Sequence, residues 1–248
     1  MTKIWSRQNL VPSTSFCERW TDSYQTVYLL AKLPTEGCPM PRDGTATRTA
    51  ILDAAEALIL ESGFSAASVD RVIAAAGITK GSFFYHFDSK AALARALIDR
   101  FAALDHEKLD ETLRRADALS DDPRQRMLAF VGLLQEEMAE LTEPYPGCLF
   151  ASYCAEAGLF DEATLQVVRD SMILWRERLG TRFANIARRH PPSIAVDPAS
   201  LADMITVVYE GAFILSRTLR EPQAVARQLA HYRNYLELLF PLDAQIRG

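Results

Sequence analysis

The stretch from Ser68 to Lys90, SVDRVIAAAGITKGSFFYHFDSK, decides the fold that we expect for this chain. Ser68 is a suitable N-cap for a short helix, because its hydroxyl can accept a hydrogen bond from a free backbone N–H. Gly77 ends that helix, since glycine readily adopts the backbone conformation that a tight turn requires. Thr79 can then cap a second short helix, Lys80 to Phe87. The pattern predicts two short helices joined by a tight turn.

Such a pair is typical of a helix-turn-helix, whose second helix fits a DNA major groove about 12 Å wide. Apolar residues are expected to hold the pair on a core: Val69, Val72, Ile73, Ile78, Phe84 and Phe87. The remaining side chains of the second helix and its cap are left for solvent or a partner: Thr79, Lys80, Ser82, Phe83, Tyr85 and His86.

Helices are also expected on both sides of this pair. The helix before it carries one apolar face, formed by Ile51, Ala54, Ala55, Leu58 and Ile59, and ends at Gly63. The helix after it starts at Lys90, with Asp88 or Ser89 as its cap, and runs past Phe101. The N-termini at Ser68, Thr79 and Ser89 offer N–H groups to phosphates, and Arg48 and Lys90 add positive charge.

The stretch resembles the DNA-binding domain of TetR-family transcriptional regulators, whose pattern is T-V-x-x-I-A-x-x-A-G-V-S-x-G-T-L-Y-x-H-F-x-S-K-E-x-L. The resemblance covers about residues 45–95. The matching positions are Ser68 (in place of Thr), Val69, Ala76, Gly77, Ile78, Thr79, Gly81, Ser82, Phe83, His86, Phe87, Ser89, Lys90 and Leu93. Two positions depart from the pattern: Phe84 replaces the usual Tyr and lacks its hydroxyl, and Ile73 replaces a small Ala.

The resemblance implies roles for the matching residues. Base edges would be read by Thr79, Lys80, Ser82 and Phe83. Phosphates would be bound by His86 and Lys90. Four further residues complete the expected set of DNA-binding residues: Arg48, Ser68, Gly81 and Tyr85. Double-stranded operator DNA is the partner that this set implies.

The rest of the chain also has helical periodicity, with no strand-like alternation. Longer helices are expected at about 123–141, 147–158, 162–189, 198–219 and 222–240, with prolines between several of them. The fold class is therefore all-α, with a helix-turn-helix domain over 43–92 and a larger helical domain over 93–248. Residues 1–42 have no sustained period; either they form a loosely ordered arm or translation begins at Met40.

The resemblance implies that the larger domain binds a small-molecule effector and forms a homodimer through the helices near 198–219 and 222–240. The residues expected to line the effector pocket are Met127, Phe130, Tyr153, Cys154, Glu156, Trp175 and Tyr209. Apolar stripes expected at the dimer interface comprise Leu201, Met204, Ile205, Val208, Ala212 and Leu215, then Leu229, Tyr232, Leu236 and Leu239.

Composition narrows the function further. The chain has 248 residues, a net charge of -5 and 49% hydrophobic residues, which is typical of a globular protein and excludes a histone-like polycation. No apolar run appears long enough to span a bilayer, so a cytoplasmic location is expected. The four cysteines lack metal-site spacing, and no catalytic motif is present, so we expect no metal, no cofactor and no enzymatic activity. A helical adaptor that binds only protein is the alternative.

Overall fold

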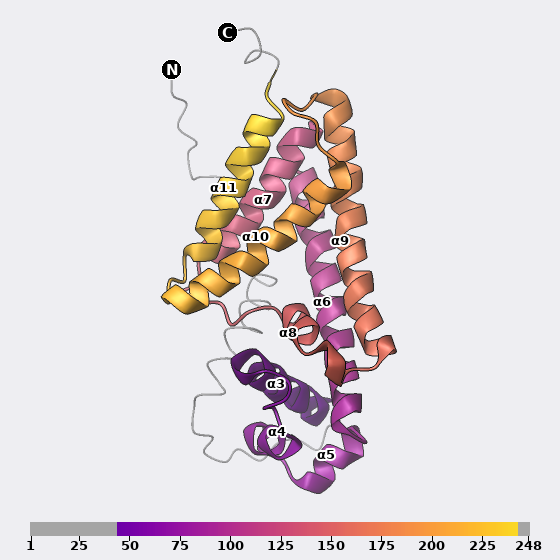
Figure 1. Cartoon of the computed structure of the whole chain (residues 1–248). Coiled ribbons are helices and arrows are strands. Elements are labelled where there is room, and N and C mark those ends of the chain that lie inside the picture. Colours follow the sequence, from indigo (N-terminus) through magenta and orange to yellow (C-terminus); the bar gives the residue numbers. More distant parts are fainter. Residues whose placement is uncertain (1–43, 243–248) are drawn as a thin grey trace.

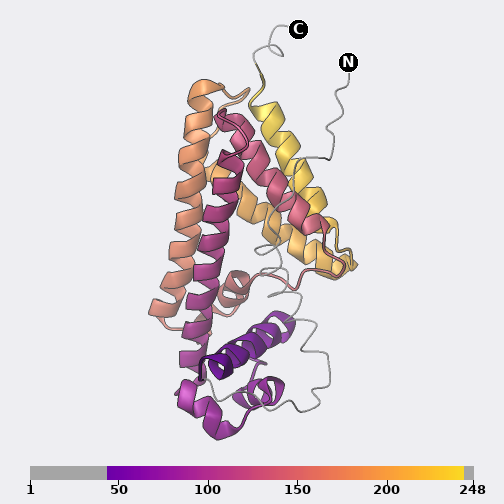
Figure 2. The same cartoon turned by 180° about the vertical axis from the view of Figure 1, so that it is seen from behind.

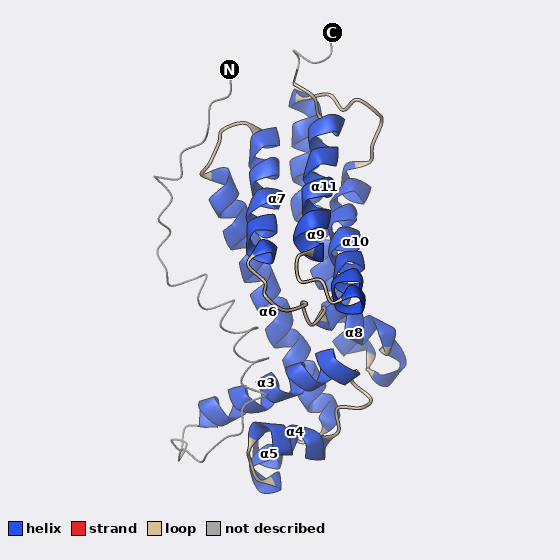
Figure 3. Ribbon diagram, turned by 90° about the vertical axis from the view of Figure 1, so that its left-hand side faces the viewer, coloured by secondary structure: helices blue, strands red, loops and turns tan. Residues whose placement is uncertain are grey.

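The computed structural model describes residues 44–242, and within this range it contains helices and loops but no strand (Figures 1 and 3). The expected segment 1–42, with Cys17 and Cys38, lies outside the described residues. The helices are α3 (Gly44–Ser62), α4 (Val69–Ala76), α5 (Lys80–His86), α6 (Lys90–Asp117), α7 (Pro123–Ala139), α8 (Leu149–Ala155), the short 3-10 helix η2 (Ala157–Leu159), α9 (Glu162–Arg189), α10 (Pro198–Leu219) and α11 (Ala224–Leu239). The all-α prediction is confirmed.

The capping residues expected from the sequence start the helices of the N-terminal half. Ser68 Oγ accepts a hydrogen bond from the Arg71 backbone N–H at 3.3 Å, and Thr79 Oγ1 accepts one from Ser82 N–H at 3.1 Å. Of the two possible caps for α6, Ser89 performs the role, because its hydroxyl accepts from Ala92 N–H at 3.1 Å. These caps satisfy N–H groups that the first turn of each helix would otherwise leave unpaired.

The turn between α4 and α5 is a Schellman motif. Gly77 has a φ of 64°, its N–H donates to Ala74 O at 3.3 Å, and Ile78 N–H donates to Ile73 O at 3.2 Å. A Cβ on Gly77 would meet no atom within 4 Å, so the positive φ alone favours glycine here. Ile73 is half-buried against the core and is accommodated in this geometry.

Two hydrophobic clusters share the long helix α6, which runs from the bottom of the molecule to the top beside α9 (Figures 1 and 2). The first cluster joins α3, α4 and α5 to the N-terminal half of α6, but it also includes Phe150 and Tyr153 of α8 and Val168 of α9. The boundary expected near residue 92 therefore falls inside one continuous helix, whose first turns belong to the core of the DNA-binding half.

The second cluster is formed by the C-terminal half of α6 with α7, α9, α10 and α11. It corrects the assignment of the apolar stripes, because most of their residues pack inside this chain. Those buried in the second cluster are Leu201, Ile205, Ala212, Leu229, Tyr232, Leu236 and Leu239, while Met204 and Val208 pack partly buried against it. Periodicity identifies a face that needs covering, but does not say whether the same chain or a second copy covers it.

Among the described residues, α10 is the one helix that is long and apolar enough to cross a membrane. An 18-residue window of this helix has a mean hydropathy of 1.3. The helix carries Asp203 and Glu210 among its apolar residues. In the structure α10 packs against α9 and α11 as part of the helical bundle (Figure 1).

Candidate DNA-binding face and effector cavity

The first turn of α5 forms the exposed end of the helix-turn-helix. Thr79, Lys80 and Gly81 are exposed, and Ser82 is half-buried. The helix lies at the lower tip of the molecule, at the end farthest from α11 (Figure 1). Because Gly81 has no side chain, a DNA backbone or base edge can approach the helix closely at this point.

The structure corrects the expected roles of two adjacent phenylalanines. Phe83 was expected to face DNA, but its side chain is 0% exposed, whereas Phe84, expected in the core, is 44% exposed. Phe83 and Phe87 are four residues apart, so they lie on one face of the helix, and their ring centroids are 6.0 Å apart. The outward positions are therefore Phe84 and the neighbouring Tyr85, which is 83% exposed.

Three other expected DNA-binding residues border this face. Arg48 on α3 is exposed, and its guanidinium lies 5.1 Å from the centroid of the Phe87 ring. His86 is half-buried and lies beside the N-terminus of α3. Its Cε1 is 3.6 Å from the position that a Cβ on Gly44 would occupy. Ser68 is exposed and uses its hydroxyl as the cap of α4. The face is thus built from α3, α4 and α5 together.

Lys90 has a different position from the one expected. Its Nζ donates to the backbone oxygen of Phe64 at 2.6 Å and lies 4.1 Å from the centroid of the Phe64 ring. Burial lowers the pKa of Lys90, and the nearby carboxylate of Glu156 opposes that shift. Lys90 therefore binds the α3–α4 loop rather than projecting toward a phosphate.

Glu156 binds the same loop. Its carboxylate accepts hydrogen bonds from the backbone N–H of Phe64 at 2.6 Å, from the N–H of Ser65 at 3.0 Å and from the Ser65 hydroxyl. The hydroxyl of Ser65, together with these backbone N–H groups and Lys90, lowers the pKa of Glu156. We call Glu156, Lys90 and the loop residues Phe64 and Ser65 the carboxylate clasp. It connects the end of α8 to the helix-turn-helix.

We expect Glu156→Gln to destabilise the protein by about 1–2 kcal/mol, because an amide replaces a charged acceptor at a partly exposed site. The lowered pKa sets the pH dependence: the stabilisation is present above the ordinary glutamate pKa of 4.5 and is lost as the pH falls through the folded-state value. Urea unfolding measured at neutral and acidic pH tests this. Glu61→Gln, at an exposed position on α3, is the control. An equal deficit at both pH values would contradict the role of the charge.

A cavity of about 110 Å³ lies in the larger domain, between α6, α7, α9, α10 and the segment that leads into α8. Trp175 and Tyr209, two of the residues expected in an effector pocket, line it. Met127 and Phe130 instead line a separate cavity of about 40 Å³ near Arg182. These four expected pocket residues are therefore divided between two separate cavities.

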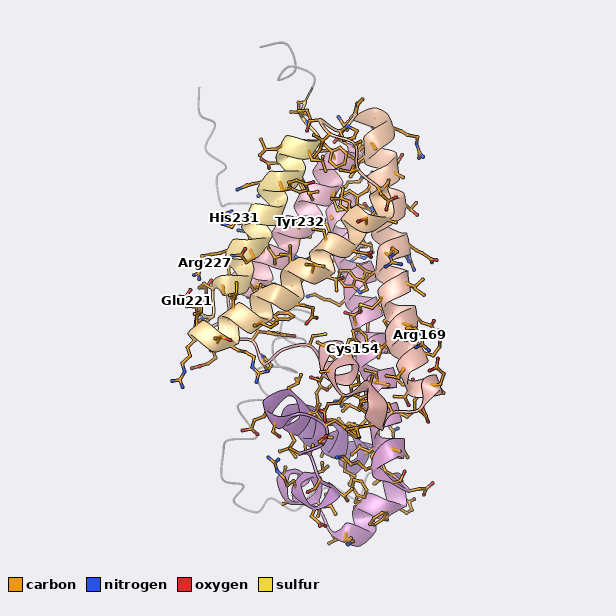
Figure 4. The ribbon with its side chains drawn as sticks, viewed as in Figure 1. Cys154, Arg169, Glu221, Arg227, His231 and Tyr232 are labelled. Atoms are coloured by element: carbon orange, nitrogen blue, oxygen red, sulfur yellow. The ribbon has the colours of Figure 1, made fainter. Side chains whose placement is uncertain are left out.

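The other three expected pocket residues lie away from the cavity. Tyr153 is 0% exposed in the first cluster and donates its hydroxyl hydrogen bond to Ala94 O at 2.7 Å. Cys154 is exposed on the outer side of α8 (Figure 4), and Glu156 belongs to the clasp. Of the large residues on the helix expected at 147–158, Tyr153 packs in the first cluster, and Phe150 packs there while also reaching the cavity wall.

Charged and polar residues that the sequence analysis did not select complete the cavity wall: Asp105, Lys108, Glu137, Tyr145, Cys148 and Glu210. A signal for some of them exists in the sequence. Phe101, Asp105 and Lys108 lie at i, i+4 and i+7, so two charged residues share a helix face with apolar ones. A charge on the core-facing stripe of an otherwise regular helix is the pattern that could have indicated the site.

Burial shifts the pKa values of several ionisable groups in the cavity wall. Burial raises the pKa of Asp105 to about 6, although the hydrogen bond from Trp175 Nε1 at 2.7 Å opposes the shift. Burial also raises the pKa of Glu210, which shares a hydrogen bond with the Cys148 thiol. The thiol itself has its pKa raised well above the usual value, so it is protonated at neutral pH.

Comparisons with known proteins agree with this geometry. Residues 51–97 match the family described as "Bacterial regulatory proteins, tetR family". The HTH-type transcriptional repressor NemR of Escherichia coli (strain K12) is 24% identical over 192 residues, covering 77% of this chain and 94% of NemR. The HTH-type transcriptional repressor DhaR of Mycobacterium sp. (strain GP1) is 27% identical over 174 residues, covering 68% of this chain and 82% of DhaR.

Solved structures extend the likeness to the larger domain. The crystal structure of the reduced form of E. coli NemR superposes with a TM-score of 0.62 at 24% identity, covering 76% of this chain and 96% of NemR. A TetR transcriptional regulator from Chloroflexus aurantiacus J-10-FL gives a TM-score of 0.64 at 26% identity, covering 80% of this chain and 98% of that one.

A capped helix-turn-helix with an exposed second helix, joined to a helical bundle that contains a cavity, defines a DNA-binding transcriptional regulator. Residues 51–97 are a DNA-binding domain of the TetR family, and most of the chain is similar to the HTH-type transcriptional repressors NemR and DhaR. None of these relatives supports the alternative of an adaptor that binds only protein.

Proposed function

We propose that this protein is a cytoplasmic, homodimeric repressor that releases a palindromic operator when a small molecule enters the 110 Å³ cavity. The observation that carries the proposal is the first turn of α5, the helix at the tip of the molecule, where Lys80 and Gly81 are exposed and Ser82 is half-buried. DNA contacts are assigned to α5 and its neighbours: Thr79, Lys80, Gly81, Ser82, Phe84, Tyr85, His86, Arg48 and the N-terminus of α4 at Ser68.

Lys80→Ala and Ser82→Ala are each expected to weaken operator binding by about 1–3 kcal/mol if these side chains read bases. Fluorescence anisotropy with operator and with non-specific duplex measures the effect on each. A base contact lowers only operator affinity, whereas a phosphate contact lowers both and reduces the salt slope by about one. Arg115→Ala, an exposed cation at the far end of α6, is the matched control. Unchanged operator affinity would remove the residue from the site.

The dimer surface is assigned to the outer faces of α10 and α11. On α10, Val207 is 68% exposed and Ile214 is 67% exposed, and their spacing of seven places both on one face. On α11, Leu238 is 75% exposed, and the exposed residue His231, seven positions earlier, shares its helix face. Figure 4 shows His231 and Arg227 on the outer side of α11. Exposed aliphatic residues on adjacent helices support an interface with a second copy, because water contact with such a surface is unfavourable.

The route from the cavity to DNA is assigned to α6 and α8. Cys148 and Phe150 line the cavity, and the clasp residue Glu156 follows α8 within a few residues. A ligand that moves α8 would therefore move the α3–α4 loop and change the separation of the two α5 helices in a dimer. The ligand must bind the released state more tightly; a coupling of about 1–3 kcal/mol is typical.

The decisive experiment is an anisotropy titration of the purified protein on DNA from upstream of its own gene, with excess non-specific competitor. Binding that resists the competitor supports the proposal, and a footprint then gives the half-site spacing. If that fragment does not bind, selection from random oligonucleotides follows. Failure to enrich any sequence would contradict the proposed operator binding.

A further inference from the structure

The charges around the cavity do not balance. Three carboxylates line it, from Asp105 on α6, Glu137 on α7 and Glu210 on α10, against one cation, Lys108. Lys108 Nζ lies 2.5 Å from Glu137 Oε2, so this pair largely neutralises itself. Among the lining residues that the structure describes, Asp105 and Glu210 have no cationic partner within ion-pair distance. Asp105 accepts from the Trp175 indole, and Glu210 shares its bond with a thiol.

Aromatic rings form much of the remaining wall. The Tyr145 and Phe213 rings stack with centroids 4.5 Å apart, and Tyr209 lies 5.5 Å from Phe213. Burial raises the pKa of Tyr145 and of Tyr209 well above the usual value, so both phenols stay neutral. The faces of such rings attract cations electrostatically, most strongly when water is excluded.

The energetics distinguish between possible ligands. A buried carboxylate without a cation is costly, and an anionic ligand would add repulsion to that cost. A neutral apolar ligand would displace water and leave both carboxylates less solvated. A cation would pair with them and contact the aromatic faces at the same time. A cationic ligand turns the unfavourable desolvation of the half-buried Asp105 and Glu210 carboxylates into an attraction.

We infer that the effector is a compact organic cation, in which an ammonium or amidinium group is attached to an aromatic or apolar body. This inference rests on the proposed function of the cavity as the effector site. The cationic group lies between Asp105 and Glu210, and the body contacts Trp175, Tyr209 and Phe213. The cavity of about 110 Å³ is of the same order as the apolar cavity of about 150 Å³ that takes up benzene, which limits the ligand body to about one ring.

Four single-ring probes test the charge preference: benzyltrimethylammonium, which is bulkier and permanently charged, and benzylamine, benzyl alcohol and benzoate, which are close to one another in size. Calorimetric titration into DNA-free protein is expected to show both cations binding about tenfold or more tightly than benzyl alcohol, with benzoate weakest. Equal or tighter binding of the alcohol or benzoate overturns the inference, as does the failure of both cations to bind.

Two substitutions test whether Asp105 and Glu210 bind the cationic group of the ligand. Asp105→Asn and Glu210→Gln are each expected to weaken benzyltrimethylammonium about tenfold while changing benzyl alcohol by less than about twofold. Glu107→Gln on α6 and Glu136→Gln on α7 are matched controls, because each removes one exposed carboxylate from a helix that lines the cavity. Equal losses in the control variants would show that only overall charge matters and would overturn the assignment to Asp105 and Glu210.

A pH series keeps the inference testable if a variant fails to fold. Benzyltrimethylammonium is charged at every pH, so its pH dependence reports the protein. Asp105 accepts a hydrogen bond from Trp175 on α9 and shares the cavity wall with the charged groups Lys108 on its own helix, Glu137 on α7 and Glu210 on α10. Its pKa of about 6 predicts that binding tightens as the pH rises through 6. A flat profile between about pH 5 and about pH 7.5 contradicts the inference.

The outcome for the ligand class is separable from the outcome for the repressor. Probe binding is measured without DNA, and operator release is measured in parallel by anisotropy. Cation binding without release would contradict effector-controlled repression and leave the ligand class intact. Operator release by a neutral or anionic compound that competes for the cavity would support the repressor and overturn the ligand class.

Discussion

Phe83→Ala is expected to destabilise the protein by about 3–5 kcal/mol, because Phe83 is fully buried and its ring joins α5 to the core of the DNA-binding half. Removing the ring leaves a cavity beneath the recognition helix. Phe87 and the first turns of α6 cannot fill this cavity unless α5 moves. Urea unfolding followed by circular dichroism measures the loss.

Phe84→Ala is the matched control, since it removes the same ring from the adjacent, 44% exposed position. Its stability should stay within about 1 kcal/mol of the wild type, because substitutions at exposed positions cost little. Its operator affinity should fall, since an outward ring on α5 can contact thymine methyl groups in the major groove. A Phe83→Ala protein of normal stability that fails only in DNA binding would restore the original expectation for Phe83.

The double variant Val207→Glu/Ile214→Glu is expected to abolish the proposed dimer and to weaken operator binding about 100-fold or more. Two carboxylates on the outer face of α10 would have to be desolvated in an interface. A monomer then contacts a single half-site and loses the gain that comes from linking two DNA-binding units. Sedimentation velocity should show a species near the chain mass of 27.7 kDa.

The control for this surface is Leu119→Glu, which places a carboxylate at a 55% exposed leucine between α6 and α7. It should leave the mass and the operator affinity unchanged. A double variant that remains dimeric would show that another surface joins the two copies. A double variant that becomes monomeric with full operator affinity would contradict the requirement for two linked half-sites.

The local structure could be predicted from the sequence, because the information for caps and turns lies within a few residues along the chain. Ser68, Thr79 and Ser89 cap helices where their hydroxyl groups predict it, and Gly77 takes the positive φ of a helix end. Prolines and apolar periodicity placed the longer helices to within a few residues. Caps and helix ends depend on short-range hydrogen bonds, which residue type and spacing largely dictate.

Which face of each helix is covered, and by which residues, depends on tertiary packing and could not be predicted from the sequence. Adjacent phenylalanines in α5 exchange the roles expected for them, because the position of the core relative to the helix axis selects Phe83 and leaves Phe84 outside. The expected dimer stripes pack within the chain, and Glu156 reaches back across 92 residues to Phe64. The cavity likewise joins Asp105, Glu137 and Glu210 from three helices. Such contacts depend on how distant segments pack, and that is not encoded in the spacing of neighbouring residues.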